Sequence, residues 1–152
     1  MPVLTDRPIL LSVPATNQYL ESLAAEVHRT YFYKYPPLPV RWGQQISRKN
    51  RRTIRLGSYN HHTAEIRVHP ILNTRTTPAF FIQSIIYHEY LHHVLGASHN
   101  RRFHKAERQF AYHRESQEWL RRNLWALLGR KKSVLTRPRV VVDWLTEQLA
   151  LF

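Results

Sequence analysis

The chain has 152 residues, of which 43% are apolar and 22% charged, a composition that fits one globular domain and excludes disordered and collagen-like classes. Lysine and arginine number 23 against 10 acidic residues, a net charge of +13, so we expect a polyanionic partner. The absence of cysteine excludes disulfides, thiol catalysis and cysteine-bound zinc, and any metal must therefore be held by histidine, aspartate or glutamate.

The first half of the chain predicts one helix followed by strands. Residues 16–35 carry apolar side chains at steps of three and four, the stripe of an amphipathic helix that the following prolines end. Residues 40–42, 51–57 and 64–69 alternate apolar and polar side chains, which predicts strands. Residues 57–60 are rich in turn formers, so we expect a hairpin with one buried face and one basic face.

The second half predicts three helices. Thr77 is a good N-cap with proline as the first helical residue, and the helix should run to Leu95, with Gly96 as its stop. Ser98 can cap a second helix that reaches residue 110, and a third helix is expected over residues 116–128.

These elements predict a single α+β domain over residues 1–152, in which a small sheet containing antiparallel strands packs against the 78–95 helix and flanking helices. The core should span about 16–128, and a basic linker with a C-terminal tail should occupy 130–152. No stretch approaches the roughly 18 apolar residues of a membrane span, and residues 1–14 hold two charges and three prolines, unlike a signal peptide. We therefore expect a cytoplasmic protein with no membrane partner.

The 78–95 helix contains the motif His88-Glu89-Tyr90-Leu91-His92, an HExxH sequence. Because four residues is just over one turn, both imidazoles lie on one face and can bind one metal ion. Glu89 lies about 100° around the helix, where it can act as general base on a water at the metal. Chance would give about 0.03 such matches in a chain of this composition, so the motif predicts a catalytic metal site.

A catalytic zinc also needs a third protein ligand and one open position. His99 follows His92 by seven residues and is the first candidate. Glu107 and His104, further along the chain, are the alternatives. The metzincin pattern is excluded, since position 95 is leucine where that pattern requires glycine and the only methionine is the first residue.

The motif order resembles that of the SprT-like zinc metallopeptidases, the family that includes Spartan, and of related minigluzincin or WLM-type domains. The resemblance covers about half the chain, from Val40 to Phe110, and is carried by Arg41-Trp42, Ile66-Arg67-Val68, Pro70-Ile71-Leu72, His88–His92 and Ser98-His99-Asn100-Arg101-Arg102-Phe103. The resemblance implies zinc on His88, His92 and His99, with Glu89 as catalytic base. Many relatives add a cysteine zinc ribbon, which this chain cannot form.

Basic residues cluster at 48–52, 101–102, 121–122 and 130–132. Such clusters bind phosphates without reading sequence, and a neighbouring aromatic side chain can stack an unpaired base. Together with the resemblance to Spartan, which digests proteins crosslinked to DNA, they predict a peptidase for DNA-associated proteins that binds single-stranded DNA. Such a protein would be associated with the nucleoid.

Two other interpretations remain open from the sequence. One is a minigluzincin-type peptidase with Glu107 as the third ligand and no role at DNA. The other is a basic nucleic-acid-binding module with a structural or vestigial zinc site, although an intact Glu89 argues against it, because a purely structural site does not need that carboxylate.

Overall fold

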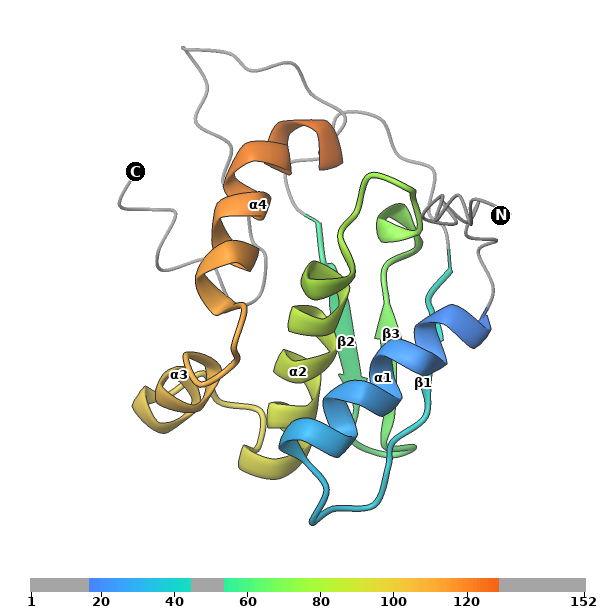
Figure 1. Ribbon diagram of the computed structural model, residues 1–152. Coiled ribbons are helices and arrows are strands. Elements are labelled where there is room, and N and C mark those ends of the chain that lie inside the picture. The colour runs from blue at the N-terminus through green and yellow to red at the C-terminus, as the bar shows by residue number, and fades with distance from the viewer. Residues whose placement is uncertain (1–16, 45–53, 129–152) are drawn as a thin grey trace, which may run out of the picture.

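The computed structural model describes residues 17–44 and 54–128 of the chain (Figure 1). The basic segment 48–52 and the linker and tail at 130–152 lie outside these described residues. The elements in chain order are α1 (Asn17–Tyr31), β1 (Val40–Trp42), β2 (Gly57–Asn60), β3 (Glu65–Val68), the short 3-10 helix η1 (Pro70–Leu72), α2 (Ala79–Leu95), α3 (Arg101–Glu107) and α4 (His113–Leu127).

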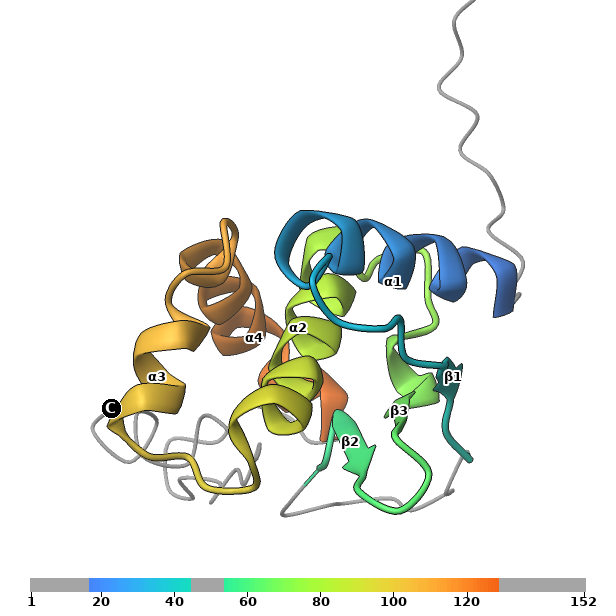
Figure 2. The same cartoon turned by 90° about the horizontal axis from the view of Figure 1, so that it is seen from below.

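The predicted α+β class is confirmed: helices α1 and α2 cover one face of a three-stranded sheet, and α3 and α4 lie on the far side of α2 (Figure 2). The strand order is β1-β3-β2, with β2 antiparallel to β3. β1 runs parallel to β3, with Val40 opposite Ile66. The sheet is therefore mixed, because the chain between β1 and β3 is long enough for the return that parallel pairing needs.

Helix α2 is the centre of the molecule. It contacts α1, α3, α4 and two strands, and every residue from Phe81 to His92 is buried. A helix enclosed on all sides gains its stability from packing rather than from an amphipathic stripe. The HExxH motif is consequently held on a rigid element.

Within the described ranges, no helix is both long and apolar enough to cross a membrane.

The hairpin differs from the prediction in register. The strand expected at 51–57 is displaced to Gly57–Asn60, the segment predicted to be the turn. Ile54 and Leu56 are buried as their alternation suggested, but they precede the paired strand. The turn follows at residues 61–64, where the Asn60 side-chain oxygen accepts from the backbone N–H groups of His62 and Thr63, an Asx arrangement that reverses the chain.

Several helix ends also differ from the sequence expectation. α1 ends at Tyr31 rather than near residue 35. α2 has Pro78 at its N-cap with no side-chain cap, and the Thr77 hydroxyl lies 2.9 Å from the hydroxyl of Thr74. α3 is capped by Asn100, not Ser98, and it ends at Glu107 rather than at residue 110, while α4 begins at His113 rather than residue 116. The predicted stop at Gly96 is confirmed.

Candidate metal centre

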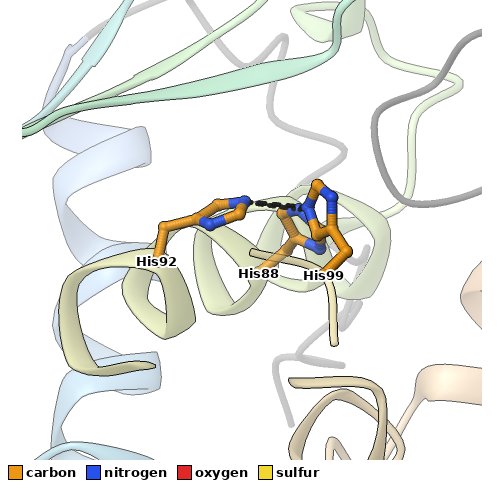
Figure 3. Close-up of side chains that lie close together, drawn as sticks. All are labelled: His88, His92 and His99. Atoms are coloured by element: carbon orange, nitrogen blue, oxygen red, sulfur yellow. Dashed lines mark hydrogen bonds between the residues drawn. The ribbon is translucent and has the colours of Figure 1, made fainter. Parts of the chain in front are cut away.

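Three imidazoles meet at the C-terminal half of α2 (Figure 3). Nε2 of His92 lies 3.2 Å from Nε2 of His88 and 3.0 Å from Nε2 of His99, and the third Nε2 pair is 3.3 Å apart. The His88 and His92 side chains are buried, and His99 is half-buried. We call these residues the three-histidine cluster.

His99 reaches the cluster because the chain reverses immediately after α2. Gly96 adopts φ +94°, a conformation that favours glycine and ends the helix. Asn100 then starts α3, its side-chain oxygen accepting from the backbone N–H of Phe103 at 3.0 Å. His99 is thus fixed between a helix stop and a helix cap.

Phe103 packs against all three rings of the cluster. Its side chain is fully buried, and its ring centroid lies 5.0, 4.7 and 4.9 Å from those of His88, His92 and His99. Edge and tilted ring contacts at this range are favourable and directional. The phenyl ring therefore restricts how far each imidazole can rotate.

The second ring nitrogens determine which way the Nε2 lone pairs point. Nδ1 of His92 lies 3.0 Å from the carbonyl oxygen of Gly96, which can only accept, so this nitrogen carries the proton. Nδ1 of His88 donates to Oε2 of Glu107 at 2.8 Å. When both imidazoles are neutral, each Nε2 is then an acceptor, and a cation between the two nitrogens would stabilise this arrangement.

The donor set fits zinc. Two buried neutral imidazoles with fixed tautomers, and a third beside them, form a ligand set that Zn²⁺ prefers. Tetrahedral zinc with nitrogen at about 2.0–2.1 Å places ligand nitrogens roughly 3.3 Å apart, close to the 3.0–3.3 Å spacing found here. Three protein ligands also leave one position open, as catalytic sites do.

Glu107 and His104, the alternative third ligands, lie outside the three-histidine cluster. The Glu107 carboxylate contacts the other nitrogen of His88 and is only 7% exposed. Burial raises the pKa of Glu107 to about 7, against the lowering effect of nearby His113 and other basic groups. The His104 ring stacks on that of His99 at 6.4 Å.

Glu89 lies on the neighbouring stripe of α2, which faces β2. The carboxylate is buried, at 4% exposure. A Cβ atom built on Gly57 would lie 2.7 Å from Oε1 of Glu89 and 2.5 Å from Cγ2 of Ile85. One turn further along, Nδ1 of His93 forms a 2.5 Å hydrogen bond with the Tyr59 hydroxyl. Strand β2 therefore lies directly against the motif helix at Glu89 and His93.

Three features of the site are not indicated by the sequence. Gly57 falls in a segment whose composition predicts a turn, yet its role is to leave space for Glu89. The helical spacing of Glu107 and Phe103 allows the acid to face inward, but nothing in it indicates the contact with His88. The contact between Tyr59 and His93 joins elements far apart in sequence, and no local pattern predicts it. For Glu107 the sequence does offer one signal, since it is the only acid among the basic residues of α3.

Comparisons of the chain with protein-family models, with curated proteins and with solved structures find no match.

Proposed function

We propose that this protein is a zinc-dependent endopeptidase. The observation that supports the proposal best is the convergence of three Nε2 atoms within 3.0–3.3 Å, with the Nδ1 atoms of His88 and His92 committed to acceptors. Bound there, Zn²⁺ supplies Lewis acidity, which lowers the pKa of a water toward about 7 and polarises a carbonyl oxygen. His88, His92 and His99 would hold the metal.

Glu89 is the general base in this proposal. Its carboxylate accepts a proton from the water that attacks the peptide carbonyl carbon, and it delivers that proton to the departing amine nitrogen as the C–N bond breaks. The carboxylate is buried beside Gly57 of β2, which limits the positions that it can take. Preorganisation of this kind saves the cost of orienting the base during the reaction.

The outer edge of β2 favours a peptide as the substrate. His69 N–H donates to the Leu56 carbonyl at 2.8 Å, so in the alternating antiparallel pattern the backbone groups of Gly57 and Tyr59 point away from β3. β2 is an edge strand of the described sheet. An extended peptide can pair with such an edge, and here it would lie beside Glu89.

For the substrate class, we favour proteins associated with DNA, with single-stranded DNA as partner. Helix α3, which begins just after His99, exposes Arg101, Arg102 and Lys105 while its only acid is buried. A surface of this kind attracts phosphates without sequence preference. A cytoplasmic, nucleoid-associated location follows from this proposal.

The test is cleavage of an unstructured protein by the zinc-loaded full chain, with and without single-stranded DNA. Glu89→Gln serves as the blank, since it should bind zinc and lose nearly all turnover. Cleavage that rises with DNA supports the whole proposal, and cleavage indifferent to DNA supports the peptidase alone. If the zinc-loaded chain cleaves under neither condition, or if Glu89→Gln cleaves like wild type, the proposed mechanism is wrong.

A further inference from the structure

The strongest observation left outside the proposed reaction is the buried carboxylate of Glu107. It is the last residue of α3, and its Oε2 lies 2.8 Å from Nδ1 of His88, on the side of the ring opposite the other two imidazoles. We infer that Glu107 is a positioning residue, which holds His88 in the tautomer whose Nε2 lone pair faces the metal position. The inference rests on the proposed zinc site.

The tautomer matters because a neutral imidazole carries its proton on either nitrogen. A proton on Nε2 of His88 would point into the three-histidine cluster and block a metal. A carboxylate acceptor at Nδ1 selects the opposite tautomer, fixes the ring plane and increases the basicity of Nε2. Glu107 thereby acts on the metal through His88 and need not touch it.

The two motif histidines are held by different kinds of acceptor. Nδ1 of His92 donates to the backbone carbonyl of Gly96, a neutral group supplied by the helix end. Nδ1 of His88 is buried where α2 meets α3, and a side chain supplies its acceptor. Of these two histidines, His88 is therefore the one whose orientation can be changed by substituting a single other residue, Glu107.

Other buried groups surround Glu107 closely. Phe103 packs one turn earlier on α3, and Tyr87 is anchored nearby by a 2.6 Å hydrogen bond from its hydroxyl to the Ala106 carbonyl. Behind the carboxylate is a narrow cavity of about 10 Å³, lined also by His113 and Ser116. This is close to the smallest space that admits one water molecule. A carboxylate is costly to bury without a partner, and the imidazole N–H is that partner.

The test compares zinc affinity, measured on the full chain by competition with a chromophoric chelator. Glu107→Ala should bind zinc about 10–100-fold more weakly than wild type, the usual effect of removing such a partner. Glu107→Gln should lose less, because the amide oxygen still accepts from Nδ1 while the negative charge is gone. Glu115→Ala, which removes an exposed acid from α4, is the control and should bind like wild type.

A spectroscopic measurement separates positioning from general stability. In the metal-free chain, the ¹⁵N shifts of the His88 ring should report a protonated Nδ1 in wild type and in Glu107→Gln. In Glu107→Ala the Nε2-protonated form should increase. A merely structural role would lower the melting temperature without changing the tautomer.

The outcomes are distinguishable from failure of the proposed function. If wild type binds no zinc, the proposed metal centre fails, while the tautomer spectrum still decides whether Glu107 orients His88. If Glu107→Ala binds zinc within about twofold of wild type, well short of the expected loss, and the His88 tautomer is unchanged, the inference is wrong. If Glu107→Ala does not fold, Glu107→Gln decides: affinity severalfold below wild type supports the inference, and equal affinity overturns it.

Discussion

Gly57 lies where β2 runs closest to α2, and the lack of a side chain there is a requirement of space. A methyl group would lie 2.5 Å from Cγ2 of Ile85 and 2.7 Å from Oε1 of Glu89, distances that van der Waals contact does not allow. Gly57→Ala should therefore displace Glu89 and lower turnover by roughly tenfold or more, since small shifts of a reacting group are expensive. Zinc affinity should change little, because the three-histidine cluster faces α3.

The matched control is Gly43→Ala. Its Cβ would have Val68 O as nearest neighbour, at 3.6 Å, which is ordinary contact. Turnover is compared by steady-state kinetics, and zinc affinity by chelator competition, on both variants. Thermal melts should show that Gly57→Ala lowers the free energy of unfolding by about 1–3 kcal/mol, because the added methyl group overpacks the site. Equal turnover in the two variants would mean that the position of Glu89 does not depend on Gly57.

At the scale of elements, α3 is short, and Asn100 both caps its start and directly follows His99. Asn100→Ala removes the side-chain acceptor for the backbone N–H of Phe103 and should cost about 1 kcal/mol of folding free energy. Because His99 directly precedes the cap, zinc affinity should fall as well. Asn100→Asp, which keeps an acceptor oxygen, should restore both quantities in urea unfolding and zinc titration. An Asn100→Ala variant as stable as wild type would contradict the capping role.

The elements also show what the sequence can and cannot predict. α2 is predictable because its apolar run, its glycine stop and the HExxH motif are all local signals, and the stop at Gly96 is confirmed. The hairpin register is not predictable, since Gly57 and Asn60 are residue types that favour turns. The reason that position 57 needs a glycine is its close approach to Ile85 and Glu89, far along the chain. Spacing makes His99 the first candidate for the third ligand and leaves Glu107 and His104 open, whereas the orientation of Glu107 onto His88 depends on how α3 packs against α2.

At the scale of the whole molecule, the three-histidine cluster joins the central helix to the segment that leads into α3. A ligand bound only by the folded state stabilises it by mass action, by about 2.7 kcal/mol at a free concentration roughly 100 times its Kd. Zinc should thus raise the melting temperature, and EDTA should reverse the rise. His99→Ala should lose most of this shift, while His61→Ala, in the exposed turn, should keep it. A shift of wild-type size in His99→Ala would exclude His99 as a ligand.

The reversal of the chain at Gly96 has a consequence for the order in which this protein matures. His99 lies only 7 residues from His92 and 11 from His88 in sequence, so the loop that must close is short and its entropic cost is low. The contact of Gly57 with Glu89 joins residues that are further apart in the chain, so the loop that it closes has a larger entropic cost. In refolding from denaturant, the three imidazoles can therefore come together before the sheet docks against α2. Metal retention and catalytic competence would then be acquired at separate times.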